Sequence, residues 1–273
     1  MRTSHLLPFV LMSALGAGWW TASAASVPPR PTPTATPGSF SNRDLRGRYA
    51  FYLQGDILSG QAQGPLAAVG IFVADGNGDI PFATRTLNAG GMVVQDDQAT
   101  GTYSVDPDGL GVIEFVASSG DMELFEFTIV NSDHLHAVPT GPNVVGWGEA
   151  FRQDVEAPPF SFDNGDFHGD YATGLIAQVL DPLGDLPVTG IGFIQADGLG
   201  NLFAKRRLSV NGVIIEDSAS GTYSVSPNGM GNALFTLPTG EREGFDFVIV
   251  TPDLQYAVAT NPSAVGIGPA RRR

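Results

Sequence analysis

The chain has 273 residues, and its 28 Asp and Glu against 14 Lys and Arg give a formal net charge of −14. An acidic excess of this size repels nucleic acid and anionic lipid surfaces, because binding to either depends on clustered Lys and Arg. The absence of cysteine excludes disulfides, thiolate metal sites and lipid attachment to a cysteine. The composition therefore predicts no nucleic-acid partner.

Residues 1–24 have the pattern of a secretory signal peptide. A short cationic start precedes an apolar run from Leu6 to Trp20, and small residues at positions 22–24 suit cleavage after Ala24. The run is shorter than a typical membrane helix, so we expect no membrane span after cleavage, with an uncleaved anchor as the alternative. The chain is expected to be exported, to a periplasm or outside the cell.

Residues 25–43 are rich in Pro and Thr and contain little to bury, which is typical of an extended linker. The remaining sequence contains two similar halves whose matching segments occur in the same order, which indicates a duplicated structural unit. We expect repeat 1 at 44–153, an inter-repeat linker at 154–166 and repeat 2 at 167–273. The matched segments are Gly47-Arg48-Tyr49 with Gly169-Asp170-Tyr171, Gly101-Thr102-Tyr103-Ser104-Val105 with Gly221-Thr222-Tyr223-Ser224-Val225, and Phe127-Thr128-Ile129-Val130 with Phe247-Val248-Ile249-Val250.

Both repeats show the period-two alternation of strands and almost no helical pattern. Phe125, Phe127 and Ile129 share one face of a predicted strand, whereas Glu126 and Thr128 share the other. Because an antiparallel sheet commonly buries one face, the Phe face is predicted to point into the core.

Tight turns separate about eight or nine predicted strands in each repeat. Short connections favour pairing in chain order, and closure of such a meander removes its exposed edges. The predicted fold is all-β, with two tandem antiparallel up-and-down meanders that form small closed β-barrels. Open sheets, sandwiches, one joint sheet across both repeats and an outer-membrane barrel are the alternatives, and the polar outer faces disfavour the last. The turn signals are Asp75-Gly76, Asp108-Gly109, Asp197-Gly198 and Asn228-Gly229.

Arg85 and Arg206 occupy the same repeat position, on strands whose alternation allows the side chain to point inward. An inward cation could anchor an acidic head group inside a barrel; an ion pair to a neighbouring strand and simple exposure to solvent are the alternatives. Tyr103 and Tyr223, beside turn glycines, complete the candidate ligand-binding set. The alternative for these tyrosines is packing, with the hydroxyl reaching a backbone partner at a barrel end.

No metal site, catalytic group or cofactor is predicted. Asp75-Gly76-Asn77-Gly78-Asp79 resembles the start of a calcium loop but lacks its later ligands, so a hairpin turn is favoured. His134 and His136 would share one strand face, a spacing that two metal-binding imidazoles could use, but no third ligand is evident from the pattern. His168 has acidic neighbours and no recognisable nucleophile.

The repeated pattern has Gly-x-Tyr opening a strand, then Asp-Gly-x-Gly, Gly-Thr-Tyr-Ser-Val and a closing Phe-x-Ile-Val strand. It resembles uncharacterised secreted bacterial proteins with lipocalin-like (calycin-type) barrels, over Leu45 to Phe151 and Phe167 to Ala270. The resemblance implies an interior that holds an apolar small molecule, as in lipocalin-like and allene-oxide-cyclase-like barrels. It implies no individual site residue.

Three functions are compatible with these features. The first is non-enzymatic binding of a small apolar ligand, or presentation of a rigid surface, by an exported protein whose protein partner is unknown. The second is a barrel isomerase or cyclase acting on a lipid-like substrate. The third is a structural or adhesive module. Binding requires an interior cavity, and catalysis also requires polar groups that converge inside it.

Overall fold

The computed structural model describes residues 39–153 and 161–273. The expected signal peptide, most of the expected linker 25–43 and part of the expected linker 154–166 lie outside the described residues. Residues 46–152 contain eight strands, which we call barrel 1. They are β1 (Arg46–Ile57), β2 (Gly64–Asp75), β3 (Asp79–Ala89), β4 (Met92–Val105), β5 (Leu110–Ala117), β6 (Met122–Asn131), β7 (His134–Pro139) and β8 (Val144–Arg152).

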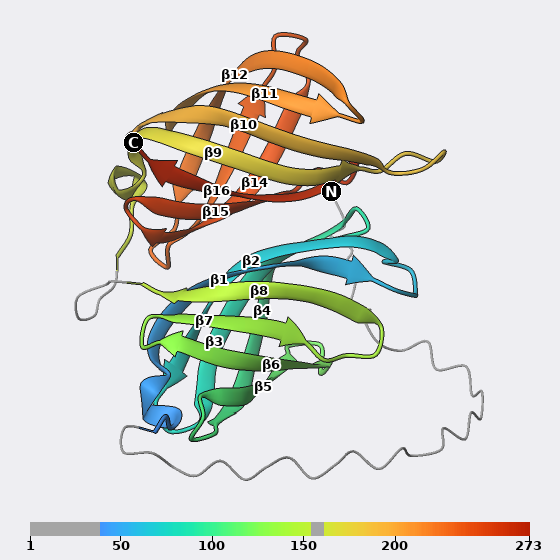
Figure 1. Ribbon diagram of the computed structural model, residues 1–273. Coiled ribbons are helices and arrows are strands. Elements are labelled where there is room, and N and C mark those ends of the chain that lie inside the picture. Colours follow the sequence, from blue (N-terminus) through green and yellow to red (C-terminus); the bar gives the residue numbers. More distant parts are fainter. Residues whose placement is uncertain (1–38, 154–160) are drawn as a thin grey trace, which may run out of the picture.

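Residues 168–272 contain eight further strands, which we call barrel 2 (Figure 1). They are β9 (His168–Val179), β10 (Leu186–Asp197), β11 (Asn201–Val210), β12 (Val213–Val225), β13 (Met230–Thr236), β14 (Arg242–Thr251), β15 (Leu254–Ala259) and β16 (Ala264–Arg272). In each barrel every strand pairs with the next along the chain, and the last pairs with the first. The prediction of two tandem, closed, antiparallel barrels is confirmed.

One end of each barrel is closed by a short 3-10 turn that precedes the first strand. These turns are η1 (Asn42–Asp44) and η2 (Asn164–Asp166). The Tyr103 hydroxyl donates to the Leu45 carbonyl at 2.7 Å, and the Tyr223 hydroxyl donates to the Phe167 carbonyl at 2.6 Å. We call this the closed end and the opposite end the mouth. Within the described parts of the chain, no helix is long and apolar enough to cross a membrane.

The interior of each barrel is lined by the apolar face that alternation predicts. Phe127 and Ile129 are buried in barrel 1, and Phe247 and Ile249 are buried in barrel 2. Their neighbour Glu126 lies on the outer face and is exposed. The hydrophobic effect therefore fixes the register, because a shift by one residue would move every Phe outward.

Turn chemistry explains the hairpins. Gly76 has a φ of 85°, in the left-handed region that glycine tolerates without strain. The Oδ1 atom of Asp75 accepts hydrogen bonds from the backbone N of Asn77, Gly78 and Asp79 at 2.7, 3.1 and 3.0 Å. This oxygen is therefore used by the turn itself, as expected of a hairpin connection.

The two barrels pack through their outer faces, with β1–β3 against β14–β16 (Figure 1). Thr86 Oγ1 donates to Asp246 Oδ2 at 2.6 Å, and Asn88 Nδ2 donates to the carbonyls of Ala259 and Ala264 at 2.8 and 2.9 Å. These bonds provide partners for the Thr86 hydroxyl, the Asp246 carboxylate and the Asn88 amide nitrogen, which docking removes from water. The buried apolar residues between the barrels are Ala50, Ala67, Val69, Ile71, Val248, Val250, Tyr256, Val258, Val265 and Ile267.

Candidate functional site

Arg85 lies inside barrel 1, where two carboxylates hold its guanidinium. Its Nε donates to Asp97 Oδ2 at 2.9 Å, and Nη1 and Nη2 donate to the two carboxylate oxygens of Glu123 at 2.7 Å each. Asp97 stands opposite Arg85 in the β3–β4 ladder, and Glu123 comes from β6. Strand pairing thus gathers three charges that are far apart in the sequence.

Barrel 2 contains the same cluster, formed by Arg206, Asp217 and Glu243. Nε and Nη2 of Arg206 donate to Asp217 at 2.7 and 3.0 Å, and Nη2 also donates to Glu243 Oε1 at 2.8 Å. Each member occupies the repeat position of its counterpart in barrel 1. The two clusters are therefore a shared feature of the duplicated unit.

Each cluster has a formal net charge of −1, since one guanidinium faces two carboxylates. A guanidinium has five N–H donors and no acceptor, and the carboxylates occupy most of the donors of Arg206. The unused lone pairs belong to Asp217 and Glu243. The cluster therefore suits a ligand group that donates hydrogen bonds or carries positive charge, and the acidic head group considered for Arg85 and Arg206 would meet net repulsion.

Burial shifts the pKa values of Arg85 and Asp97 in the barrel 1 cluster in opposite directions. It lowers the pKa of Arg85, but the charges and hydrogen bonds of Glu123 and Asp97 outweigh it, so the pKa of the guanidinium is raised. Burial also raises the pKa of Asp97, against the opposing effect of Arg85. The pKa of Arg206 is raised in the same way by Glu243 and Asp217.

The mouth of barrel 1 is closed by apolar side chains, which we call the plug. The β1–β2 loop contributes Ala62, which is 3 % exposed. Beneath the plug, beside Arg85, a cavity of about 70 Å³ remains, room for about two water molecules. The buried residues of the plug are Leu53, Ile57, Ala62, Leu66, Ala68, Leu87 and Ala89.

The mouth of barrel 2 is open and leads to a cavity of about 940 Å³. Its lining includes Arg206, Asp217 and Glu243, and a smaller cavity of about 110 Å³ lies against Arg206, Glu243 and the aromatic interior. Apolar side chains at the repeat positions of the plug line the larger cavity instead of filling it. They are Leu175, Val179, Val188, Leu208 and Val210.

The β9–β10 loop accounts for this difference. It spans residues 180–185 and has the same length as the β1–β2 loop, residues 58–63. Gly184, the counterpart of Ala62, is exposed, and the neighbouring Leu183 is 99 % exposed. The loop therefore places no side chain in the mouth, and barrel 2 keeps the space that barrel 1 fills.

Tyr103 and Tyr223 lie at the closed ends, apart from the ion-paired clusters. The Tyr103 hydroxyl also accepts a hydrogen bond from the backbone N of Gly76 at 2.8 Å. Both hydroxyls thus reach backbone partners, which was the packing alternative for these residues. The structure does not bring them together with Arg85 or Arg206.

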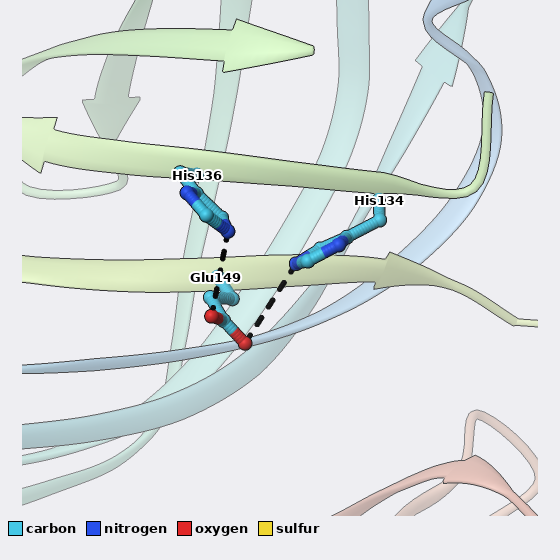
Figure 2. A group of neighbouring side chains, drawn as sticks. All are labelled: His134, His136 and Glu149. Carbon is cyan, nitrogen blue, oxygen red and sulfur yellow. Dashed lines mark ion pairs between the residues drawn. The ribbon is translucent and has the colours of Figure 1, made fainter. Parts of the chain in front are cut away.

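The three histidines among the described residues lie outside the barrel interiors. His134 and His136 lie on the outer face of barrel 1, where Glu149 of β8 joins them (Figure 2). His168 Nδ1 lies 2.5 Å from the Gly165 carbonyl, and its Nε2 lies 2.9 Å from Arg272 Nη2, so this imidazole supports the start of barrel 2.

Sequence reasoning identified the two arginines but missed their acidic partners. Asp97 and Asp217, like Glu123 and Glu243, stand 120 positions apart. The repeat alignment that paired the arginines therefore also carried a signal for the carboxylates. No comparable signal was available for Glu149, because its repeat counterpart is Pro269.

No protein-family model matches the chain, and no curated protein matches it. Among solved structures, a protein of unknown function from the DUF3598 family of Nostoc punctiforme PCC 73102 is 12 % identical, with a TM-score of 0.25, over 84 % of this chain and 97 % of that one. A candidate AttH from Nitrosomonas europaea is 11 % identical, with a TM-score of 0.26, over 90 % and 98 %. Intact Ap-TbpB, with its N and C lobes, is 8 % identical, with a TM-score of 0.23, over 82 % and 76 %.

Proposed function

We propose that this chain is an exported binding protein whose barrel 2 takes a small amphipathic molecule. The ligand has an apolar body and a head group that donates hydrogen bonds or is cationic. Barrel 1, with its plugged mouth, serves as the structural partner. The lipocalin-like resemblance of the sequence agrees with this assignment, as does the expected location in a periplasm or outside the cell.

The observation that carries the proposal is the cavity of about 940 Å³ with a charged cluster in its lining. Pockets for small molecules measure about 300–1,000 Å³ and combine apolar walls with a few polar groups. Here the walls include Leu175, Leu208 and Phe245, and the polar groups are Asp217 and Glu243 with Arg206 between them. Burial of an alkyl or ring system against these walls provides affinity, and the cluster orients the head group.

The net charge of the cluster sets the preference for the head group. A carboxylate would approach a site of net charge −1 in which the donors of Arg206 are already engaged. An ammonium or a hydroxyl instead reaches the free lone pairs of Asp217 and Glu243. The proposed order of affinity for one tail is therefore amine, then alcohol, then carboxylate.

The test compares dodecylamine, dodecanol and laurate, three probes with the same tail, by isothermal titration below their micellar concentrations. The chain is exported, purified without harsh detergent and first checked by native mass spectrometry for a ligand that co-purifies. We expect dodecylamine to bind at least about tenfold more tightly than laurate, a difference of about 1.4 kcal/mol. Laurate binding as tight as the amine would contradict the assigned head group.

A loop exchange tests the location of the site. Replacing residues 180–185 with the sequence of residues 58–63 places alanine at the position of Gly184 and is expected to close the mouth and abolish probe binding. Leu183→Ser is the matched control, because this side chain is 99 % exposed and faces away from the cavity, and it should leave probe affinity unchanged. Unchanged affinity after the loop exchange would exclude barrel 2 as the site.

A barrel enzyme acting on a lipid-like substrate is the second candidate, because polar side chains do converge at the cavity of barrel 2. Catalysis by proton transfer needs a carboxylate free to act as a base. Asp217 and Glu243 are instead both engaged by Arg206, which favours binding over turnover. Mass spectrometry of a bound ligand after incubation separates the two, since only an enzyme alters the mass or retention of its ligand.

A further inference from the structure

Three side chains of the types that ligate metals converge on the outer face of β7 and β8 (Figure 2). His134 and His136 project to the same side of β7 because they are two residues apart on a strand. Glu149 stands directly opposite His136 in the β7–β8 ladder. Glu149 Oε1 lies 3.5 Å from His136 Nε2, and Glu149 Oε2 lies 3.7 Å from His134 Nε2.

These separations are too long for good hydrogen bonds, which measure about 2.7–3.2 Å between N and O. They are close to the spacing of ligands around a tetrahedral ion. With bonds of about 2.0–2.1 Å to zinc, neighbouring ligand atoms lie about 3.3–3.4 Å apart. The three ligand atoms all lie within 4.8 Å of one another, so a small inward shift suffices to enclose an ion.

Neighbouring side chains restrict the three groups. Phe151 stacks on His134 with ring centroids 4.4 Å apart, and Trp147 meets His136 edge-on at 6.3 Å. Glu149 stands opposite Tyr52 in the β1–β8 ladder, and burial, followed by the charge of Glu149, raises the pKa of Tyr52. Packing against these neighbours limits the movement of the three side chains.

His134 supplies a second observation that points to a ligand. Its Nε2 atom is shielded from solvent, and no group in the described residues forms a hydrogen bond with it. A buried nitrogen that forms no hydrogen bond costs free energy, and a metal ion at this position would remove the cost. His136 is about half exposed, so the opposite side of the cluster is open to water.

We propose that His134, His136 and Glu149 bind a divalent transition-metal ion, with Zn²⁺ as the preferred occupant. Zinc accepts two imidazoles and one carboxylate and keeps a fourth position for water or another donor. The open side of His136 leaves room for that fourth ligand. Cu²⁺ would also bind, since it forms stronger complexes than zinc with nitrogen and oxygen donors.

Barrel 2 shows that the site is not a general property of the scaffold. Tyr256 pairs with Pro269 in the β15–β16 ladder, at the positions of His136 and Glu149. Leu254 takes the position of His134. All three ligands are thus absent together from the second repeat, while the strand pairing is retained.

The experiment is zinc titration of the exported chain, purified without a histidine tag and stripped with a chelator. Outside the expected signal peptide the chain has three histidines, and the third, His168, is the matched control. We expect one Zn²⁺ per chain with a Kd of roughly 1 μM or lower, and at least about a tenfold loss in His136→Asn and in Glu149→Gln. His168→Asn should retain the affinity of the original chain.

Two further readouts separate ligation from a structural effect. X-ray absorption of the zinc-loaded chain should show two imidazoles, with zinc–nitrogen distances of about 2.0–2.1 Å. Zinc should raise the Tm of the original chain and of His168→Asn, but not that of the two ligand variants, whose metal-free Tm and circular dichroism show that they fold. Unchanged zinc affinity in both ligand variants, or a Kd above about 1 mM for the original chain, would overturn the proposal.

Discussion

Val69 and Ile191 occupy the same position of the two repeats, but Val69 is fully buried and Ile191 is 69 % exposed. The difference arises from docking. Val69 lies on the outer face of β2, which packs against β14–β16 of barrel 2. Within residues 39–153 and 161–273, no second barrel covers Ile191 on β10. An apolar residue at the same outward strand position is therefore buried in one repeat and exposed in the other.

The first prediction concerns this pair. Val69→Lys places a charge in the apolar layer between the barrels and is expected to destabilise the chain by about 3 kcal/mol or more. Ile191→Lys, at the matched exposed position, should change the free energy of unfolding by less than about 0.5 kcal/mol. Urea denaturation measures both values. Equal effects would mean that the barrels do not dock through β2 in solution.

The second prediction concerns the buried ion pairs. Arg85→Met leaves Asp97 and Glu123 unpaired beneath the plug of barrel 1, and removal of one partner of a buried pair costs about 3–5 kcal/mol. Arg206→Met should cost less, because water enters the open mouth of barrel 2 and solvates the two remaining carboxylates.

Denaturation of these two variants is compared with that of a triple variant, Arg85→Met with Asp97→Asn and Glu123→Gln. The triple variant should recover much of the stability lost by Arg85→Met, since no unpaired charge remains. A triple variant less stable than Arg85→Met would show that lost packing, and not charge burial, causes the defect.

The third prediction concerns the closed ends. Tyr103→Phe removes the acceptor of the Gly76 N–H and the donor to the Leu45 carbonyl, and should cost about 1–3 kcal/mol. Tyr223→Phe should have a similar cost in barrel 2, where the hydroxyl donates to Phe167. Dodecylamine affinity measured with Tyr223→Phe should stay unchanged, because this tyrosine lies at the end opposite the cavity. A tenfold loss of affinity would instead support the ligand-binding role suggested by the sequence.

The fourth prediction concerns pH. Hydrogen bonds from the backbone N of Asn77 and Asp79 lower the pKa of Asp75, and the side chain and backbone of Asn201 do the same for Asp197. A folded-state pKa below the unfolded value means that the ionised group stabilises the fold above an unfolded pKa of about 3.9, and that this contribution disappears as the pH falls through the folded pKa.

Asp75→Asn should therefore lower the Tm at pH 7, and the difference from the original chain should shrink below about pH 3. Thermal unfolding followed by circular dichroism at pH 7, 5 and 3 provides the measurement, and Asp197→Asn serves as the second copy of the test. A Tm difference that is the same at all three pH values would show that turn geometry, and not ionisation, is responsible.

Much of the fold could be predicted from the sequence because turns and strand alternation depend on residues that are close together along the chain. Asp75-Gly76 requires a positive φ in a tight turn, and Gly76 has a φ of 85°. The alternation around Phe127 determines which face is buried, whatever lies further along the chain. Duplication and short connections then leave few topologies besides a closed meander.

The candidate site could be predicted only in part. The repeat alignment showed that Arg85 and Arg206 are equivalent, and alternation placed them inside. Their partners depend on strand register, which includes an irregularity in the β3–β4 ladder between Arg85 and Leu87, near Asp96 at a φ of 54°. No local sequence pattern predicts which acidic residue of a neighbouring strand forms an ion pair with an inward arginine.

The sequence by itself determined the secondary structure, the duplication and the inward positions of the two arginines, since each follows from the spacing of residues along one strand or turn. Only the tertiary structure decided which barrel is filled. Ala62 and Gly184 belong to loops of equal length, but the first turns into the mouth and the second turns away from it. It also decided that Glu149 meets His134 and His136. In both cases the outcome depends on packing and pairing between segments that the chain brings together only when it folds.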